Sequence, residues 1–560
     1  MTILTLNKKE LENKIGRIDD KIRNKIDMFG TPIDNETEAE ISIEVFPNRP
    51  DLLSLQGFSR SFNNFLEKGK IKDYKVEKPE KNYKVIIEKS VKKVRPYTVC
   101  AIVKGLNFND EKIKEVIDIQ EKIHSSYGRN RKKLAVGIYP LEEIKLPIKF
   151  LAKNPKEIKF RPLDFTNEIN ARQILNQHPV GREYGHLLKD YEVFPVFEDA
   201  KGNILSMPPI INSEKTGKIN EKTKDVFIEC SGFSKGYLEK SLNIIVCALS
   251  DLGGRLYGME IEDKEENKKY LSPNLELEKM ELSTTYINKN LGLELTEKEI
   301  IKHLEKMGIS CEKNKSKKSK IGDITALIPS YRTDIIHEID LAEEVAIAYG
   351  YDNFKPEIPK ISTIGEEDSI DILKRKIAGV LIGLGIQEIS TYHLSTKEQQ
   401  FKKVNIKEFK DSIIEVISSK TEKNILRTSL IANSIQILGE NSDVSYPQKI
   451  FELGRIFYNN KNSETEIGEK EKLCISLCHE QANFTELKQV LDYFMRMFNK
   501  SYELKETKNV IFIDGRVGII LINGEGVGVI GEINPVVLKN NKIKMPVSSL
   551  EIDIDFLRNL

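Results

Sequence analysis

A cluster of acidic residues lies in the segment PSYRTDIIHEIDLAEEVAIAYGYD, at residues 329–352. Asp340, Glu343 and Glu344 are spaced at i, i+3 and i+4, which places their side chains on one face of a helix, and Asp334 lies about a turn and a half upstream. Like charges this close destabilise an isolated helix, so the segment requires a compensating cation. Mg²⁺ suits such carboxylate ligands. The alternative is a solvated acidic face neutralised by nearby Lys and Arg, and spacing alone leaves both open.

The length and charge of the chain limit its organisation. Its 560 residues exceed what one core organises, so we expect roughly three to five domains. A content of 39% hydrophobic and 31% charged residues is typical of a soluble globular protein. The 87 Lys and Arg residues almost cancel the 86 Asp and Glu residues, so any contact with nucleic acid must come from local basic patches.

Several features predict a cytoplasmic protein. The six cysteines are sparse and mostly lie in apolar, strand-like runs, which indicates reduced thiols. Cys474, Cys478 and His479 fall in KLCISLCH, whose pattern is that of a strand, so we do not expect zinc there. The N-terminus lacks a basic region followed by an apolar core, and no run approaches 18 apolar residues. We therefore expect neither secretion nor a membrane span.

Four domains are predicted from the order of the patterns. Residues 1–75 form a small α/β domain with a helix from Lys8 to Ile15, a strand at 39–46 and a second helix starting at Pro50 and Asp51. The stretch KDYKVEKPEKNYK, at 72–84, has the composition of a linker. Residues 85–268 are typical of a mixed α/β domain, with a helix from about Asp110 to Ser126 followed by the basic run GRNRKK.

The other two domains follow in the C-terminal half. In residues 272–356, Thr296 and Glu299 predict a capping box, and two strands joined by the basic tip KNKSKKSK precede the acidic helix. This order of elements is that of winged-helix-like folds. In residues 365–560, a helix is followed by alternating strands, among them SIIEVIS and KIFELGRIFY, with a further helix at 484–498. Many strands with few helices predict a large antiparallel sheet flanked by helices.

Several motifs along the chain resemble the β subunits of phenylalanyl-tRNA synthetases of the archaeal and eukaryotic type. They are NRPDLLSLQGFSR, GRNRKKLAVGIYPLEEIKLPI, NQHPVGREYGHLL, MPPIINSEKT, PSYRTDIIHEIDLAEEVAIAYGYD, RTSLIANSIQIL, YPQKIFELGRIFY and GVIGEINPVVL. They occur in the family's order and cover essentially the whole chain. The resemblance implies an α+β multidomain fold with an N-terminal α/β domain, an editing domain, a winged-helix-like domain and a C-terminal domain like that of class II synthetases.

In that family, two α and two β chains form a heterotetramer, and the α chain binds ATP and phenylalanine and charges tRNA-Phe. This chain agrees with that division, because it has no Phe-Arg-x-Glu segment, and Gly531 stands where the arginine of the Gly-rich segment GEGVG would fall. We therefore expect no catalytic residues for aminoacylation. Gly526, Gly528 and Gly531 also match GxGxxG, but EINPVV follows instead of a helix start, and Asn523-Gly524 predicts a type I′ hairpin turn.

The resemblance also implies a hydrolytic editing site in the 85–268 domain. A pocket that accepts phenylalanine through apolar contacts rejects tyrosine by only about 10², so a second site must remove tyrosyl esters. We expect His178 to orient water or the ester, and Asn212, Ser213 and Glu214 to bind the tyrosyl hydroxyl or the terminal ribose. The alternatives are a surface histidine in a turn for His178 and local backbone capping for Asn212 and Ser213.

Two other functional sets follow from the resemblance. Arg129, Arg131, Lys132 and Lys133 of GRNRKK are expected to contact tRNA phosphates; the alternative is a solvated charge run. The family further implies Mg²⁺, in a structural or interfacial role, as the cation of the acidic helix, and this chain has acids at all four family positions. These ligands are Asp334, Asp340, Glu343 and Glu344.

The C-terminal domain is expected to pack against the α chain, around Arg427 and Glu452; ordinary core packing is the alternative. A rival interpretation of the whole chain is a non-catalytic tRNA-binding scaffold whose editing site has decayed. It is kept open by Pro140 and Ser231, where the family more often has an acid and a threonine. A free-standing deacylase would leave residues 365–560 without a role.

Overall fold

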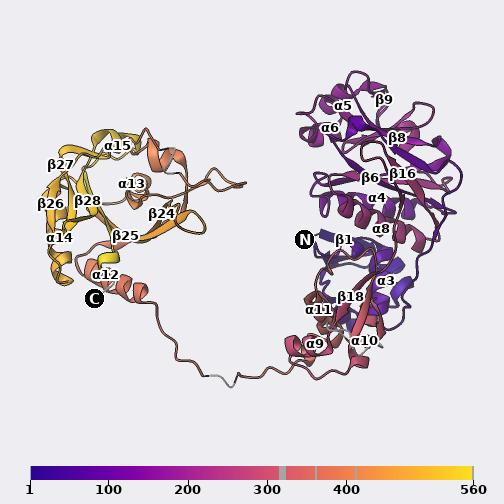
Figure 1. Cartoon of the computed structure of the whole chain (residues 1–560), viewed down its shortest axis with the longest axis horizontal. Coiled ribbons are helices and arrows are strands. Elements are labelled where there is room, and N and C mark those ends of the chain that lie inside the picture. The colour runs from indigo at the N-terminus through magenta and orange to yellow at the C-terminus, as the bar shows by residue number, and fades with distance from the viewer. Residues whose placement is uncertain (1, 314–322, 360–361, 410–412, 558–560) are drawn as a thin grey trace. The chain divides into compact units, whose positions relative to one another are not determined.

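The computed structural model describes residues 2–313, 323–359, 362–409 and 413–557. The chain divides into two units, Met1–Glu357 and Ile358–Leu560 (Figure 1). Among the described residues, no helix combines the length and the apolar character that a bilayer span requires. The six cysteines are free thiols.

The N-terminal module of the first unit packs three helices on a small antiparallel sheet of order β1-β3-β2. Pro50 starts only a short 3-10 helix, Pro50–Leu52, and the following α-helix begins at Leu55 with Ser54 as its N-cap. The helix start predicted at Pro50 and Asp51 was therefore at least four residues too early. A Cβ at Gly57 would lie 2.0 Å from the Asp51 carbonyl oxygen, so this close approach requires glycine. The elements are β1 (Thr2–Asn7), α1 (Lys8–Ile15), α2 (Asp20–Met28), β2 (Ile33–Glu36), β3 (Glu40–Val45) and α3 (Leu55–Phe65).

Two stacked sheets form the centre of the first unit (Figure 1). The five-stranded sheet has the order β4 (Val76–Glu77), β15 (Arg255–Tyr257), β6 (Tyr97–Lys104), β14 (Val226–Gly232), β7 (Leu134–Pro140). The seven-stranded sheet has the order β13 (Ile211–Asn212), β12 (Ile204–Met207), β11 (Phe194–Glu198), β8 (Ile148–Lys153), β5 (Lys84–Ile87), β16 (Met259–Asp263), β17 (Lys268–Ser272). Within the predicted linker at 72–84, Val76 and Glu77 pair with β15 as β4, whereas most of its other residues are exposed.

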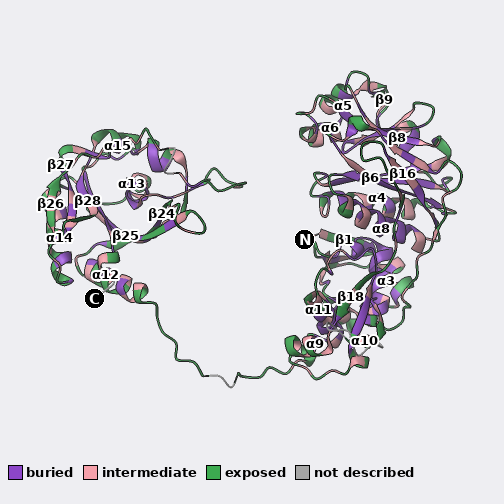
Figure 2. Ribbon diagram, in the orientation of Figure 1, coloured by how far each residue is buried: buried purple, intermediate pink, exposed green. Residues whose placement is uncertain are grey.

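Alternation along the strands gives the five-stranded sheet two buried faces. Ile102 and Phe227 point into the core between the two sheets, while Val103 and Ile228 point to the core shared with α4 (Asp110–Ser125) and α8 (Lys235–Asp251). The interior of β6 is accordingly buried throughout (Figure 2). Short elements complete this region: β9 (Lys159–Phe160), β10 (Ile169–Asn170), α5 (Ala171–Gln177), α6 (Pro179–Tyr184) and α7 (Glu214–Gly217).

The predicted winged-helix order is present in the last part of the first unit. Thr296 and Glu299 form the predicted capping box, and the acidic helix ends before Gly350 as predicted. The elements are β18 (Glu278–Leu282), α9 (Thr284–Leu291), α10 (Glu297–Lys306), β19 (Ser310–Lys313), β20 (Ile324–Ile328) and α11 (Glu338–Tyr349). The basic tip KNKSKKSK lies, apart from Lys313, outside the described residues.

The second unit is one seven-stranded sheet of order β21-β24-β25-β29-β28-β27-β26, antiparallel at every pair except β21–β24. Helices α12 and α14 share one core with the sheet, and α13 and α15 share another. The elements are α12 (Ser369–Gly383), β21 (Gln387–Glu388), β22 (Leu394–Ser395), β23 (Ile425–Leu426), α13 (Leu430–Glu440), β24 (Gln448–Asn459), β25 (Ile467–Cys478), α14 (Phe484–Met497), β26 (Glu503–Glu506), β27 (Phe512–Ile522), β28 (Glu525–Ile533), α15 (Pro535–Asn540) and β29 (Val547–Asp553).

Two predictions for the second unit have opposite outcomes. Asn523 and Gly524 have φ of 53° and 83° between β27 and β28, which confirms the hairpin turn. The strand predicted over SIIEVIS is wrong for its described part, residues 413–418, where Glu415 forms only an isolated bridge to Ile425. The division into domains at 1–75, 85–268, 272–356 and 365–560 stays a prediction.

A buried ion pair lies in the second unit. Arg427 donates to the Glu452 carboxylate at 2.6 Å, and both side chains are 2% exposed. The Thr391 hydroxyl lies within hydrogen-bonding distance of both side chains, and the Arg455 carbonyl accepts from Arg427 at 2.7 Å. Both residues thus have internal partners, and their predicted position against the α chain stays a prediction.

We expect Arg427→Ala to destabilise the second unit by about 3–5 kcal/mol, because it leaves the Glu452 carboxylate buried without its cation. Arg375→Ala is the matched control, since Arg375 pairs with Glu367 at 2.7 Å but is 67% exposed, and we expect it to cost less than about 1 kcal/mol. Calorimetric unfolding of the full chain measures both. Equal losses for the two variants would contradict this prediction.

Candidate functional site

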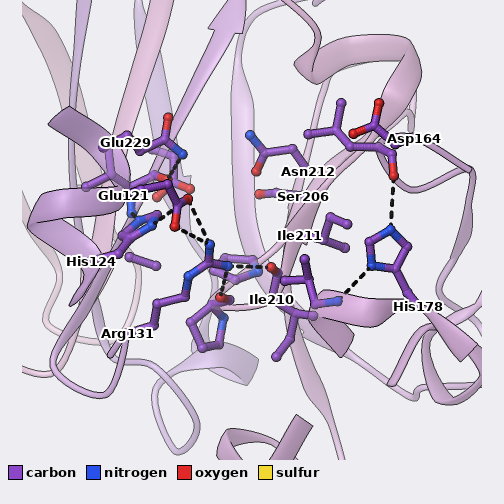
Figure 3. A pocket seen from close by; sticks show the side chains of 17 residues that line it. Glu121, His124, Arg131, Asp164, His178, Ser206, Ile210, Ile211, Asn212 and Glu229 are labelled. Carbon is purple, nitrogen blue, oxygen red and sulfur yellow. Dashed lines mark hydrogen bonds and ion pairs between the residues drawn. The ribbon is translucent and has the colours of Figure 1, made fainter. Parts of the chain in front are cut away.

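A cavity of about 190 Å³ opens between helix α4, strands β7, β12 and β14, and the loops at 163–164 and 208–212 (Figure 3). This space corresponds to roughly six water molecules, which suits a single amino-acid side chain better than a nucleotide. Its lining includes Gln120, Glu121, His124, Arg131, Ala135, Val136, Leu163, Asp164, His178, Val180, Ser206, Asn212 and Glu229.

One wall of the pocket is an ion pair between α4 and the turn that follows it. The Arg131 Nη2 lies 2.9 and 3.0 Å from the two Glu121 oxygens, and its Nη1 donates to the carbonyl oxygens of Pro209 and Ile210 at 3.2 and 2.7 Å. Partial burial pulls the pKa of Glu121 upward, but the hydrogen bonds from His124 and Arg131 and the charge of Arg131 outweigh it and hold this pKa at about 2. Glu121 is therefore ionised at neutral pH.

The His124 ring is held in one tautomer. Its Nε2 accepts the Val136 N–H at 2.8 Å, so the proton is on Nδ1, which faces Glu121 at 3.3 Å. Burial lowers the pKa of His124, against the pull of Glu121. This histidine is neutral and has no free lone pair for accepting a proton.

Both ring nitrogens of His178, on the opposite wall, are also engaged in hydrogen bonds. Its Nδ1 accepts the Val180 N–H at 3.2 Å, at the start of α6, and its Nε2 donates to the Leu163 carbonyl at 3.0 Å. His178 is 6% exposed, so it is not a surface histidine in a turn. Both ring nitrogens are engaged in positioning the pocket wall, as Figure 3 shows.

A buried acid lies at the polar end of the pocket. Glu229 on β14 is 2% exposed, and the Tyr139 hydroxyl lies 3.2 Å from its Oε1, 2.8 Å from the Ser206 Oγ and 3.4 Å from the Asn212 Oδ1. Burial raises the pKa of Glu229 to about 8, although Arg95 and Tyr139 pull it down. Glu229 is thus largely protonated at neutral pH, and it presents an O–H as well as acceptor oxygens.

Two buried polar atoms in the lining have no hydrogen-bond partner among the described residues: the Glu229 Oε2 and the Arg131 Nε. A buried polar group without a partner costs about 1–3 kcal/mol. A ligand with a hydroxyl or a carbonyl group would supply the missing partner, so the pocket is suited to a polar ligand.

The predicted editing residues separate into two groups. His178 and Asn212 line the pocket, whereas Ser213, which is 3% exposed, and Glu214 do not. The Glu214 carboxylate accepts the Asp164 N–H at 3.0 Å, and this hydrogen bond is the main cause of its lowered pKa. Glu214 therefore holds the loop at 163–164 in place.

The predicted tRNA-contact residues also separate. Arg131 is 8% exposed and forms the pocket wall, whereas Arg129 and Lys132 are exposed and Lys133 is half-buried. The separation arises in the turn itself, because Arg129, Asn130 and Arg131 all have positive φ, at 49°, 52° and 62°. Within this left-handed run, Arg129 and Asn130 are exposed, whereas Arg131 is buried in the pocket wall.

Sequence reasoning missed Glu121, His124, Ser206 and Glu229 as pocket residues, and it missed Tyr139, which is buried behind the lining and contacts Ser206 and Glu229. One signal was present for Glu229, a single acid inside the apolar strand run VFIEC, since an unpaired charge is costly in a buried strand. A second was the i, i+3 spacing of Glu121 and His124 on one helix face.

The acidic helix has an internal cation. Arg332, which is 2% exposed, bonds Asp334 at 2.9 and 2.7 Å and Glu344 at 3.1 and 2.8 Å. The Asp340 carboxylate accepts the N–H groups of residues 336 and 337, both at 2.7 Å. Glu343 is exposed, and its pKa is raised by partial burial and by the neighbouring acids.

Among the described residues, no three His, Cys, Asp or Glu side chains are grouped so that they could hold a metal ion together. The four acids as placed therefore do not fit the predicted Mg²⁺ site, because Arg332 and the helix N-terminus occupy three of them. An ion would have to displace Arg332 from at least one carboxylate. Mg²⁺ binding at Asp334, Asp340, Glu343 and Glu344 stays a prediction.

Three family descriptions match the chain: "B3/4 domain" at residues 82–244, "tRNA synthetase B5 domain" at 280–351 and "Phenylalanyl tRNA synthetase beta chain CLM domain" at 355–554. The pocket lies in the first of these, the acidic helix in the second and the second unit in the third.

Full-length relatives agree with these matches. The phenylalanine–tRNA ligase beta subunit of Archaeoglobus fulgidus is 37% identical over 99% of this chain and 98% of its own length. That of Pyrococcus abyssi is 39% identical over 92% and 90%, and that of Methanosarcina barkeri is 33% identical over 100% and 99%.

A solved structure also matches the first unit. The N-terminal fragment of the phenylalanyl-tRNA synthetase β subunit from Pyrococcus horikoshii is 35% identical, with a TM-score of 0.58, and covers 62% of this chain and 99% of the fragment. The chain belongs to the phenylalanyl-tRNA synthetase β-subunit family, in its archaeal form.

Proposed function

We propose that this chain assembles with an α chain into a cytoplasmic α₂β₂ enzyme. In this enzyme the α chain binds ATP and phenylalanine and charges tRNA-Phe, and the chain described here contributes no catalytic residue to aminoacylation. We propose further that its pocket hydrolyses tyrosyl esters of tRNA-Phe. The similar proteins from Archaeoglobus fulgidus and Pyrococcus abyssi are beta subunits of phenylalanine–tRNA ligases, which supports the first part. The pocket's size and its polar end support the second.

The observation that carries the editing proposal is the Glu229 carboxyl group in the pocket lining, whose Oε1 lies 3.2 Å from the Tyr139 hydroxyl and whose Oε2 has no hydrogen-bond partner among the described residues. A tyrosyl hydroxyl would complete the hydrogen bonds of this group, whereas a phenylalanyl ring would leave it unpaired. A site that binds a substrate hydroxyl rejects the analogue lacking it by about 10⁴–10⁵. The pocket is thereby suited to hydrolyse Tyr-tRNA-Phe and to leave Phe-tRNA-Phe intact.

The ester end of the substrate lies, in this proposal, toward Arg131 and His178. Both histidines of the pocket have their ring nitrogens engaged, so neither serves as a strong base in this conformation. The unpaired Arg131 Nε provides a donor for the ester carbonyl, and the hydroxyls of the terminal adenosine can assist the water. His178 and Glu214 act by positioning the walls.

We expect Glu229→Leu to lower kcat/KM for hydrolysis of Tyr-tRNA-Phe by about tenfold or more, because the tyrosyl hydroxyl then meets an apolar side chain. Phenylalanine charging by the complex with the α chain should not change. Glu260→Leu is the matched control, since this acid of the same domain is 41% exposed and lies outside the pocket. Deacylation of Tyr-tRNA-Phe and Phe-tRNA-Phe by the full chain measures the effect. Absence of hydrolysis by the unaltered protein would instead favour a scaffold with a decayed site.

The raised pKa of Glu229 predicts a pH-dependent stability. Its folded-state pKa of about 8 lies above its ordinary value of 4.5, so the stabilisation is complete below pH 4.5 and is lost as the pH rises to about 8. In Glu229→Gln the side chain is neutral at every pH, so this loss of stability with rising pH does not occur. The variant should therefore gain stability relative to the unaltered protein between pH 5 and pH 9, by on the order of 3–5 kcal/mol for a shift of this size.

Unfolding of the first unit, followed by calorimetry at pH 5, 7 and 9, measures this difference. The Glu260→Leu variant provides the control, because Glu260 is partly exposed and no pH-dependent difference of this sign is expected from it. A constant difference between Glu229→Gln and the unaltered protein across the three pH values would show that Glu229 is ionised in the folded state.

A further inference from the structure

One buried cation near the pocket has no ion-pair partner. Among the described residues, four of the buried arginines form ion pairs with carboxylates, namely Arg49, Arg131, Arg332 and Arg427. Arg95 is also buried, at 2% exposed, but no carboxylate in the described part of the chain forms an ion pair with it. A buried charge without such a partner destabilises the folded state, so packing alone does not account for Arg95.

The Arg95 side chain holds Ser231 of strand β14 through two hydrogen bonds. Its Nε donates to the Ser231 hydroxyl at 3.1 Å, and its Nη2 donates to the Ser231 carbonyl at 2.6 Å. The guanidinium also lies 5.6 Å from the centre of the Phe233 ring. Arg95 follows the short 3-10 helix Lys89–Val91, and its own N–H donates to the Val91 carbonyl at 2.8 Å. Both its backbone and its side chain are therefore fixed.

Ser231 connects this anchor to the pocket. Glu229 and Ser231 are two residues apart in β14, so their side chains point to the same face of the sheet. Ser231 pairs with Ala135 on β7, and Ala135 and Glu229 both line the pocket. The two hydrogen bonds from Arg95 thus fix β14 at the residue next to Glu229 on that face.

The charge of Arg95 also acts on Glu229. Burial raises the pKa of Glu229 to about 8, and the charge of Arg95 is the largest of the effects that oppose burial. Burial lowers the pKa of Arg95 itself to about 10, so this side chain is charged at neutral pH. The other titratable side chains that interact with this pair are Tyr139, Cys100, Cys230 and Tyr191.

We propose that Arg95 is a positioning residue for recognition of the tyrosyl ester and that it acts through Glu229. It holds Ser231 on the shared strand face, and it places a positive charge near the carboxyl group that receives the tyrosyl hydroxyl. A hydrogen bond to a carboxylate is stronger than one to a neutral group, so a cation that stabilises the carboxylate favours a substrate with a hydroxyl donor. The choice of this substrate rests on the proposed editing function.

The test compares hydrolysis of Tyr-tRNA-Phe and Phe-tRNA-Phe by the full chain. Arg95→Met should lower the ratio of kcat/KM for the two esters about tenfold, mainly by raising KM for the tyrosyl ester. Arg95→Lys keeps the charge and should lower this ratio less. Arg255→Met is the matched control and should leave the ratio unchanged, because Arg255 is exposed on β15 of the same sheet and does not line the pocket.

A double-mutant cycle measures whether Arg95 acts through Glu229. In the Glu229→Gln background, Arg95→Met should change the ratio by less than about twofold, because the group on which the charge acts is absent. An equal loss in both backgrounds would overturn the proposal. An unchanged ratio in Arg95→Met alone, or an equal loss in Arg255→Met, would also overturn it.

Calorimetric unfolding separates this proposal from the editing function. Arg95→Met removes the cation that opposes the raised pKa of Glu229, so the stability lost through Glu229 should continue to fall to a higher pH. The stability gained by Glu229→Gln at pH 9 should therefore be larger in the Arg95→Met background than in the unaltered protein, and equal gains would contradict the proposal.

The outcomes remain distinct if one part fails. If the unaltered chain hydrolyses neither ester, the editing function fails, and the calorimetric comparison still decides whether Arg95 acts on Glu229. Arg95→Gln, which also lacks the charge, replaces Arg95→Met in both comparisons if the methionine variant does not fold.

Discussion

The burial of strand β14 on both faces is the constraint on which the pocket depends. Helices α4 and α8 cover one face of its sheet and the seven-stranded sheet covers the other, so Glu229 is only 2% exposed. In such an environment a carboxyl group is stable only when it is protonated or fully paired. Burial raises the pKa of Glu229 to about 8, and its Oε2 has no hydrogen-bond partner among the described residues, so the proposed preference for a tyrosyl ester rests on this oxygen.

Two buried arginines elsewhere in the chain are stabilised differently, by ion pairs with carboxylates. Arg332 and Arg427 are both about 2% exposed at the side chain, and each has carboxylate partners within 3 Å. In both clusters the buried charges are compensated within the protein, so we interpret these groups as structural. The pocket differs from these two ion-pair clusters. Of the three sites, as far as their residues are described, the pocket alone combines a buried carboxyl group that has an unpaired oxygen with an adjoining cavity.

Local features of the fold could be predicted from the sequence because short-range chemistry determines them. Thr296 and Glu299 cap one another across three residues, and Asn523 and Gly524 both tolerate positive φ. The strand predicted over SIIEVIS failed because an alternating pattern does not supply a neighbouring strand to pair with. The acidic segment predicted a cation, but sequence spacing could not decide between a metal ion and Arg332, which lies in the same motif.

The pocket could be predicted only in part. His178 and Asn212 were found through motifs, but Glu229, Tyr139 and Ser206 come from three strands of two different sheets, and only the packing of those sheets brings them together. Arg131 was assigned to the surface because its neighbours are cations. Its inward direction depends on three successive left-handed residues, which composition does not reveal.

That turn connects the pocket wall to a set of exposed cations. Left-handed backbone conformations at non-glycine residues are strained, and here the strain is offset where Arg131 bonds Glu121 and the carbonyls of the 208–212 loop. The outward direction of Arg129 and Lys132 is therefore secured by bonds made inside the cavity. A substitution of Arg131 would therefore be expected to change the inner wall and the placement of Arg129 and Lys132 together.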